Sequence, residues 1–231
     1  MNQDEFCLEA KKYQIDLTEK QLNQFVLYAQ LLQEWNEKMN LTAIVEWDEI
    51  FQKHFLDSMT IAPFCLNASS LADIGSGAGF PGLVMKIVFP QLHVTLVEPT
   101  NKRCNFLKEV ISQLQLNEVD VLNERAEDLK NLRESFDVVT ARAVANLQVL
   151  SELCLPLVRI DGSFVSMKGA AGRQEVADAK NAISLLGGQV AAVEDLLMSD
   201  GSSRVNVNIK KVRITPMKYP RAYGQIKKKP L

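Results

Sequence analysis

Apolar residues near the start of the chain recur at helical spacing. Thr18 and Gln21 form a capping-box pair, in which a hydroxyl at the N-cap is followed three residues later by glutamine. Beyond this pair the apolar side chains follow a helical period: Leu22, Phe25, Val26, Leu32 and Trp35. The pattern predicts an amphipathic helix over residues 18–38 and a second helix over about 48–62 that ends at Pro63. We therefore expect residues 1–66 to form an N-terminal helical extension.

From Leu71 onward, short apolar runs alternate with helical segments, which is typical of βαβ units and a parallel sheet covered on both faces. Two last runs flank the turn at Ser199–Ser203 and predict a hairpin. We therefore expect an α/β domain over residues 67–215, with a mostly parallel sheet and an antiparallel last strand. The predicted strands are 71–74, 93–98, 120–122, 136–141, 162–167, 189–197 and 205–212, and the predicted helices are 80–89, 101–115, 146–158 and 172–186.

Composition excludes several classes of protein. Apolar residues make up 47% of the chain and charged residues 23%, the mix of an ordinary globular domain. No stretch is long and apolar enough for a membrane span, and acids stand near the N-terminus where a signal peptide has bases, so we expect a cytoplasmic protein. Four well-separated cysteines and two histidines show no metal-ligand spacing, so no metal site is expected.

The C-terminal segment has a strong excess of positive charge. Residues 201–231 contain nine basic side chains and no acidic one, whereas the other 200 residues hold 17 bases and all 28 acids, a net charge of −11. This segregation favours a polyanionic partner such as nucleic acid, and a solvated tail that only maintains solubility is the alternative. Pro216, Pro220 and Pro230 predict that the basic tail over 216–231 lacks regular structure.

A glycine-rich loop joins the first predicted strand to the helix that follows it. Residues 72–82 read Ala-Asp-Ile-Gly-Ser-Gly-Ala-Gly-Phe-Pro-Gly. Glycines in this position permit positive φ and let a ligand approach the backbone closely. Glu98 ends the next strand, where a carboxylate can accept hydrogen bonds from a ribose diol. The loop therefore predicts a binding site for a cofactor that contains a ribose.

Two patterns overlap within this loop. Gly77, Gly79 and Gly82 match the dinucleotide fingerprint G-x-G-x-x-G, whereas Gly75, Gly77 and Gly79 behind Asp73 resemble motif I of the S-adenosylmethionine-dependent methyltransferases. A pyrophosphate favours a helix N-terminus free of other negative charge, whereas an acid at Asp73 suits the sulfonium and ammonium groups of S-adenosylmethionine. We therefore expect S-adenosylmethionine, with a nicotinamide dinucleotide or a turn without ligand as the alternatives.

Two further segments are placed to complete the pocket. Ala126 and Glu127 follow the third predicted strand, and their backbone groups can pair with the edge of an adenine; the alternative is an acidic first turn of a helix. Arg142 follows the fourth strand, at the carboxyl edge where ligands bind in open α/β sheets. An arginine at such a point either serves the site or lies on the surface.

The residues around the fourth strand restrict the chemistry. Enzymes that methylate exocyclic amines often have an N/D-P-P-Y/F-type tetrapeptide after the fourth strand. This chain has Arg142-Ala-Val-Ala145 there, which disfavours methylation of an exocyclic amine. Cys154 falls in an apolar helical stretch, which favours a core cysteine over the thiolate that methylation of pyrimidine carbon needs. Lys168, at the end of the fifth strand, is a candidate base for methylation of a hydroxyl. A ring nitrogen such as guanine N(7) needs only positioning, so the lack of evident acid–base residues favours that acceptor.

Several motifs occur together in the order typical of one known family. They are Trp35-Asn-Glu-Lys-Met-Asn-Leu-Thr42, His54-Phe-Leu-Asp-Ser58, the loop Ala72–Gly82, Lys102-Arg103 with Phe106-Leu107, Arg125-Ala-Glu127, Thr140–Ala143 and Lys168-Gly169. Over nearly its whole length the chain resembles the ribosomal small subunit methyltransferase G family, also called the glucose-inhibited division protein B family.

The resemblance implies a bacterial enzyme with a Rossmann-like class I S-adenosylmethionine-dependent methyltransferase fold. Such an enzyme transfers a methyl group from S-adenosylmethionine to N(7) of guanine 527 of 16S rRNA, as free RNA or in a 30S particle, and we expect a monomer. By position, the family's cofactor contacts carry over to Gly75, Phe80, Ala126, Glu127 and Arg142. The loop chemistry adds Asp73, Gly77, Gly79 and Glu98 to the expected cofactor site.

Arg142, Asp57 and Lys168 are the candidate catalytic residues. His54 and Asp57 lie three residues apart on one predicted helix face, so they either pair with each other or face the catalytic cleft. Two other classes of function stay open beside the methyltransferase. One is a nicotinamide oxidoreductase, and the other is a non-enzymatic nucleic-acid binder on the same fold.

Overall fold

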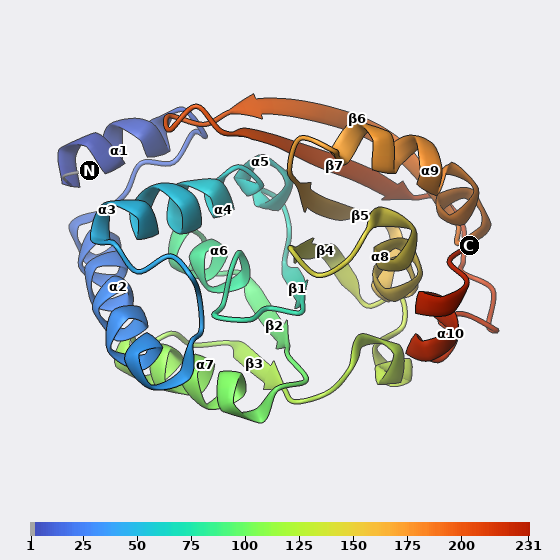
Figure 1. Cartoon of the computed structure of the whole chain (residues 1–231), viewed down its shortest axis with the longest axis horizontal. Coiled ribbons are helices and arrows are strands. Elements are labelled where there is room, and N and C mark those ends of the chain that lie inside the picture. Colours follow the sequence, from blue (N-terminus) through green and yellow to red (C-terminus); the bar gives the residue numbers. More distant parts are fainter. Residues whose placement is uncertain (1–2) are drawn as a thin grey trace.

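A seven-stranded sheet forms the centre of the molecule. The computed structural model describes residues 3–231, and its strands are β1 (Ser70–Ile74), β2 (His93–Val97), β3 (Val119–Leu122), β4 (Phe136–Arg142), β5 (Val158–Lys168), β6 (Gly188–Leu197) and β7 (Ser203–Lys211). They lie in the order β3-β2-β1-β4-β5-β7-β6 (Figure 1). Strand β7 is antiparallel to both β5 and β6, and the pairings among β1 to β5 are parallel. The predicted α/β fold is confirmed.

Helices cover both faces of the sheet because successive strand residues point to opposite sides. Leu71 belongs to one buried apolar cluster and its neighbour Ala72 to the other. The first cluster includes buried residues of α6 and α7, and the second those of α8 and α9. The elements concerned are α6 (Gly82–Val88), α7 (Asn101–Gln113), α8 (Leu147–Cys154) and α9 (Gly172–Leu185), with short 3₁₀ turns η2 (Ala126–Asp128), η3 (Lys130–Leu132) and η4 (Leu155–Leu157) between strands.

The N-terminal extension is helical, as predicted, but its second half is a continuous helical run over 47–59 that contains a π-helix, followed by a separate short helix. Its elements are α1 (Gln3–Lys11), α2 (Glu19–Met39), α3 (Trp47–Glu49), the π-helix η1 (Ile50–Leu56), α4 (Asp57–Met59) and α5 (Ala62–Cys65). The capping box is present at Thr18 and Gln21. The prediction of one helix that ends at Pro63 is wrong, because Pro63 lies in the first turn of α5. Proline is tolerated there, because N–H groups in the first turn of a helix have no partner within the helix and proline lacks only that group.

This extension shares its core with the sheet. Phe6 packs edge-on against Phe25, with the ring centroids 5.2 Å apart, and Phe25 contacts Phe55 of η1 at 4.9 Å. Tyr28 of α2 then stacks on Phe80 of the glycine loop at 5.3 Å. All five side chains belong to the same buried cluster as α6 and α7. The extension is therefore packed directly against the loop that follows β1.

The hairpin of β6 and β7 crosses from the edge of the sheet to the N-terminal helices (Figure 1). Met198 lies at its tip, is buried, and accepts a contact at 4.0 Å from the hydroxyl of Tyr13, which follows α1. The predicted hairpin is thus confirmed. Its position brings Arg204, at the start of β7, over the segment that contains η1 and α4.

The basic tail is ordered, which corrects the prediction that it lacks regular structure. It contains the short helix α10 (Tyr223–Lys228), which packs against α8 (Figure 1). Arg221 pairs with the fully buried Glu152 of α8, and Ile226 is fully buried. The prolines lie on either side of α10, so they bound the helix and do not interrupt it. Tertiary packing has ordered a segment that local sequence signals leave undecided.

Within residues 3–231, no helix has the length and apolar character needed to cross a membrane. The same residues contain no group of three or more His, Cys, Asp or Glu side chains placed to hold a metal ion. All four cysteines are free.

Candidate active site

The glycine loop leaves β1 in a conformation that suits glycine. Gly75, Gly77 and Gly79 have φ angles of 69°, 57° and 94°, in the left-handed region that other residues rarely adopt. A Cβ on Gly75 would come within 2.6 Å of the Val144 Cγ2 atom, and one on Gly79 within 2.5 Å of the Tyr28 hydroxyl. The predicted glycines therefore allow α2 and the segment after β4 to approach the loop closely.

Two predicted carboxylates hold this loop from opposite sides. Asp73 is fully buried, and its Oδ2 accepts a hydrogen bond of 2.8 Å from the N–H of Gly82 at the start of α6. Burial raises the pKa of Asp73 to about 7. Glu98 accepts hydrogen bonds from the N–H groups of Gly77 at 3.0 Å and Thr100 at 2.8 Å. Glu98 therefore borders the loop, whereas the Asp73 carboxylate points to α6 and has no exposed surface.

Ala126 and Glu127 lie at the same carboxyl edge of the sheet. They begin the turn η2, and Ala126 belongs to the buried cluster that contains Ile74 of β1 and Val97 of β2. The first N–H groups of a helical turn have no partner within the turn. The backbone of Ala126 and Glu127 can therefore serve as the polar edge of a cofactor pocket.

Phe80 is at the centre of a stack of side chains from three parts of the chain. On one side it stacks on Tyr28, with the ring centroids 5.3 Å apart and the ring planes at 20°. His54 of η1 stacks on it at 4.3 Å and 14°. The Arg142 guanidinium lies 5.0 Å from the ring centroid. Phe80 thus joins the glycine loop to Arg142 at the end of β4.

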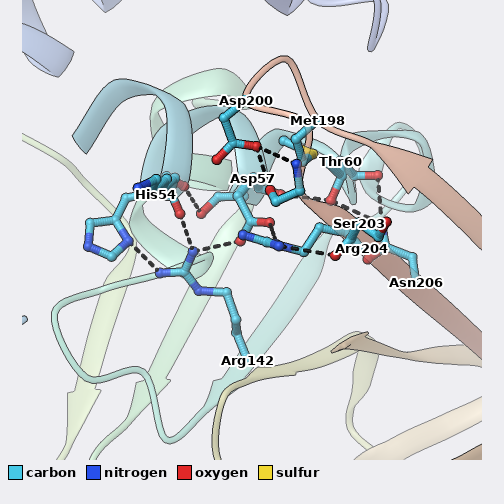
Figure 2. Close-up of polar contacts among 12 residues, drawn as sticks. His54, Asp57, Thr60, Arg142, Met198, Asp200, Ser203, Arg204 and Asn206 are labelled. Carbon is cyan, nitrogen blue, oxygen red and sulfur yellow. Dashed lines mark hydrogen bonds and ion pairs between the residues drawn. The ribbon is translucent and has the colours of Figure 1, made fainter. Parts of the chain in front are cut away.

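Arg142 is held in place by three acceptors (Figure 2). Its Nη1 donates to the Asp57 Oδ2 at 2.8 Å and to the Lys53 carbonyl at 3.2 Å, and its Nη2 donates to the His54 Nδ1 at 3.1 Å. The side chain is 15% exposed. A guanidinium has five N–H groups, so in the described part of the chain two of them remain for a ligand.

His54 is neutral in this setting. Burial and the adjacent Arg142 guanidinium lower the pKa of His54 to about 3. Because Nδ1 accepts from Arg142, the single ring proton lies on Nε2, which donates to the Thr42 hydroxyl at 3.0 Å. The Thr42 N–H in turn donates to the Asn36 Oδ1 at 2.8 Å. The Trp35–Thr42 motif therefore reaches Arg142 through His54.

Asp57 joins two arginines from distant strands. Arg204 of β7 donates through Nε to the Asp57 Oδ1 at 2.7 Å, while Arg142 of β4 occupies Oδ2 (Figure 2). The Asp57 N–H donates to the His54 carbonyl within the helix, but among residues 3–231 no hydrogen bond or ion pair joins the two side chains; each contacts Arg142 instead. Sequence reasoning missed Arg204, for which the only signal was its place in a basic segment after the hairpin turn.

Lys168 also lies at this edge, where it connects α9 to the segment after β4. Its ammonium contacts the Glu175 Oε2 at 2.8 Å and donates to the Ala145 carbonyl at 2.6 Å. Glu175 also accepts from the Leu147 N–H at 2.7 Å. Both contacts use the side-chain nitrogen of Lys168, so this geometry favours a structural cation over the candidate base.

The three candidate catalytic residues line one cavity of about 600 Å³. Four basic and two acidic side chains line it: Lys53, Arg142, Lys168, Arg204, Asp57 and Glu175. With His54 neutral, the lining has a net charge of +2. Ala143, in the cavity wall, has a left-handed φ of 57°, a strained conformation that often marks functional sites. Arg142 lines this cavity and also lies over the ring of Phe80 in the glycine loop.

The fold is that of Rossmann-like methyltransferases. A 16S rRNA (adenine(1408)-N(1))-methyltransferase from Catenulisporales acidiphilia superimposes with a TM-score of 0.53 and 15% identity, covering 71% of this chain and 93% of the other. A family model for rRNA small subunit methyltransferase G matches residues 21–203. The chain belongs to the rRNA small subunit methyltransferase G family.

Two close relatives agree with this assignment over their whole length. The ribosomal RNA small subunit methyltransferase G of Bacillus cytotoxicus is 46% identical over 237 residues, covering 100% of this chain and 99% of the relative. The protein of the same name from Staphylococcus aureus strain JH9 is 50% identical over 230 residues, covering 96% and 95%. The family resemblance inferred from the sequence motifs is confirmed.

Proposed function

We propose that this protein transfers a methyl group from S-adenosylmethionine to N(7) of guanine 527 of 16S rRNA, in the bacterial cytoplasm. One observation carries the proposal: Arg142 contacts Phe80 of the glycine loop and also lines the 600 Å³ cavity. A cofactor on the loop and a base in the cavity would therefore meet at Arg142. Family membership supports the acceptor, because relatives of this chain carry the name of a small subunit rRNA methyltransferase.

The residues around the loop suit S-adenosylmethionine. The two Glu98 oxygens each accept one N–H bond from the backbone, and Oε2 also lies 3.7 Å from the Arg103 guanidinium. A carboxylate oxygen can accept a second hydrogen bond, which leaves Oε1 for a ribose hydroxyl. The backbone of Ala126 and Glu127 would face the adenine. When bound, the cofactor supplies an electrophilic methyl group on a sulfonium.

The protein's own residues act by orienting the reactants. Guanine N(7) has a lone pair in the ring plane and needs no base to attack a methyl group. In agreement, His54 is neutral with its Nδ1 lone pair occupied, and Lys168 is paired with Glu175. Arg142, fixed by three acceptors, is left to orient both reactants through its two remaining N–H groups. Positioning of this kind contributes several kcal/mol to a two-substrate reaction.

The charge of the cavity suits a nucleotide. Its four cations come from η1, β4, β5 and β7, and its two acids from α4 and α9, which gives a net charge of +2. An RNA phosphate would be attracted to these cations. Guanine is one of the larger bases, and 600 Å³ is within the range of pockets that hold ligands of this size.

The nicotinamide alternative has less support from the geometry. Gly82, the last glycine of the dinucleotide pattern, is the first residue of α6, and its N–H is already bonded to the Asp73 carboxylate at 2.8 Å. A pyrophosphate needs such N–H groups at the start of this helix. Asp73 thus takes the place that a phosphate would use.

Isothermal calorimetry on the full chain tests the cofactor directly. We expect heat from S-adenosylmethionine and from its demethylated product, and none from NAD or NADP. A methyl-transfer assay with 30S particles and with free 16S rRNA then tests the acceptor. Binding of a dinucleotide in place of S-adenosylmethionine, or transfer to a base other than guanine 527, would overturn the proposal.

A further inference from the structure

The docked tail presents positive charge that the active site does not use. Of the nine basic residues in 201–231, three have acidic partners within the fold: Arg204 with Asp57, Lys211 with Glu134, and Arg221 with Glu152. Lys227, Lys228 and Lys229 are exposed and have no acidic partner within residues 3–231. These three lysines, at the end of α10 and directly after it, form what we call the tail cluster.

The segment that carries the tail cluster is held in place by an ion pair and by a buried apolar side chain. The Arg221 Nε and Nη2 donate to the two Glu152 oxygens at 2.8 and 2.6 Å, and the Arg221 N–H adds a third bond at 2.9 Å. Ile226 is fully buried beneath α10. Fixing the backbone costs about 1–2 kcal/mol per residue, and burying the Glu152 charge costs more. A tail that served only solubility would gain nothing from being ordered.

The docking brings both ends of the segment that carries the tail cluster into contact with elements at the carboxyl edge of the sheet. Arg125 directly precedes Ala126 in the chain. Its guanidinium lies 5.7 Å from the centroid of the Tyr223 ring in α10. The Gln148 side chain, in the first turn of α8, donates to the Leu231 carbonyl at 3.1 Å. Because α8 begins after the exit of β4, the end of the tail reaches the edge where Arg142 lies.

We propose that the tail cluster binds the phosphate backbone of the RNA substrate while the cavity takes the base. This inference rests on the proposed function. Lysine ammonium groups act as point charges toward phosphate and confer no base specificity. The docked backbone has already lost its conformational freedom, so binding orders fewer residues than it would with a mobile tail.

Replacement of the tail cluster tests this inference against a matched control. The test protein carries Lys227→Gln, Lys228→Gln and Lys229→Gln, and the control carries Lys11→Gln, Lys20→Gln and Lys38→Gln on exposed positions of the N-terminal helices. Both lose three charges, so a non-specific field effect is equal in the two. The RNA is a 16S fragment around the target, and its dissociation constant is measured between 50 and 200 mM salt.

We expect the tail variant to bind about tenfold more weakly than the control at low salt, with the slope of log affinity against log salt reduced by about 2. Equal affinities and slopes for the two variants would overturn the inference. A second measurement does not depend on stability: a photoreactive amino acid at position 228 should cross-link the RNA and one at position 20 should not. The absence of a cross-link at position 228 would also overturn it.

The wild type separates this inference from the proposed function. If wild-type protein binds S-adenosylmethionine and methylates the RNA while the tail variant behaves like the control, only the role of the tail cluster is lost. If the wild type transfers no methyl group to 16S rRNA, the proposed function itself fails.

Discussion

Arg142 places a positive charge in the wall of the cavity, and only 15% of its side chain is exposed. A buried charge is costly unless it is paired and hydrogen-bonded, and here Asp57, His54 and the Lys53 carbonyl supply the partners. Asp57 is in turn fixed by Arg204. We infer that these residues determine the direction of the two N–H groups that Arg142 leaves for a ligand.

Replacement of Arg142 by alanine should therefore reduce methyl transfer by about 100-fold or more, the effect of losing a preorganised donor. The stability loss should stay near 1–3 kcal/mol, because Asp57 keeps its bond to Arg204. Single-turnover rates and urea unfolding measure the two effects. Arg213→Ala is the control, since Arg213 is exposed and, among residues 3–231, its side chain donates only to the Ser184 carbonyl. Wild-type turnover in the Arg142 variant would remove this residue from the site.

His54 should make stability depend on pH in a defined direction. Its pKa is lowered to about 3 in the fold, against about 6.5 in an unfolded chain. Below about pH 6.5 the unfolded state binds the extra proton and the folded state does not, so stability falls as pH falls toward 3. The wild type should lose about 2 kcal/mol more than His54→Gln between pH 7 and 5.

Urea unfolding of both proteins at the two pH values checks this. The raised pKa of Asp73 acts in the opposite direction, and it cancels because both proteins contain it. Identical pH slopes for the wild type and His54→Gln would show that His54 titrates normally in the fold.

At the residue scale, sequence reasoning identified positions better than partners. Arg142 and Lys168 were found because each follows a predicted strand directly, and the structure brings them to one cavity with Asp57. The contact between Asp57 and Arg204 joins residues 147 positions apart, and no local pattern reports such a pair. Asp73 was expected at the cofactor, but the start of α6 needs an acceptor and the carboxylate is turned to it.

At the scale of elements, α2 supports the glycine loop through Tyr28. The Tyr28 hydroxyl donates to the Ala78 carbonyl at 2.5 Å, and its ring stacks on Phe80. The loop has three residues in left-handed conformations, which need support from surrounding structure. We infer that α2 holds the loop in the shape that the cofactor needs.

Tyr28→Phe removes only the hydroxyl and should weaken S-adenosylmethionine binding by about fivefold, equivalent to about 1 kcal/mol. Tyr28→Leu also removes the stacked ring, and we expect a further loss of stability of about 2 kcal/mol. Calorimetry and urea unfolding give the two values. Tyr13→Phe is the matched control, because the Tyr13 hydroxyl contacts Met198 at 4.0 Å and not the loop. Equal cofactor affinity in both Tyr→Phe variants would contradict a role for α2.

The order of the elements was predictable, but one helix was not. Alternating apolar runs predicted the strands and the four helices between them, because burial on both faces imposes that pattern. The segment 48–62 also has helical spacing, yet it contains the seven-residue π-helix η1. Apolar spacing does not distinguish a π-helix from an α-helix over so few residues, and π-helices often occur at functional sites. Lys53 and His54, which both contact Arg142, lie in η1.

At the scale of the whole molecule, the three regions expected from the sequence pack as one unit. The N-terminal helices share a core with β1, α6 and α7, and the tail packs into the core on the other face of the sheet. Charge segregation along the chain predicted a polyanionic partner. The fold keeps much of that segregation at the surface, because only three of the nine cations in 201–231 have acidic partners in the described part of the chain.

Arg221→Ala tests whether the tail is part of the fold. It leaves the fully buried Glu152 carboxylate without its partner, and loss of one member of a buried pair costs about 3–5 kcal/mol. Urea unfolding should show this loss, whereas Arg213→Ala should change stability by less than about 0.5 kcal/mol. A loss below about 1 kcal/mol for Arg221→Ala would mean that the tail is not docked in solution.

The most direct measurement of the central claim is mass spectrometry of the 16S rRNA fragment that contains guanine 527. It compares bacteria that lack this chain with the same bacteria given back either the wild type or Arg142→Ala. We predict that the fragment loses one methyl group, as 7-methylguanosine, when the chain is absent, and regains it with the wild type and not with Arg142→Ala. A fragment that stays methylated without the chain would contradict the account.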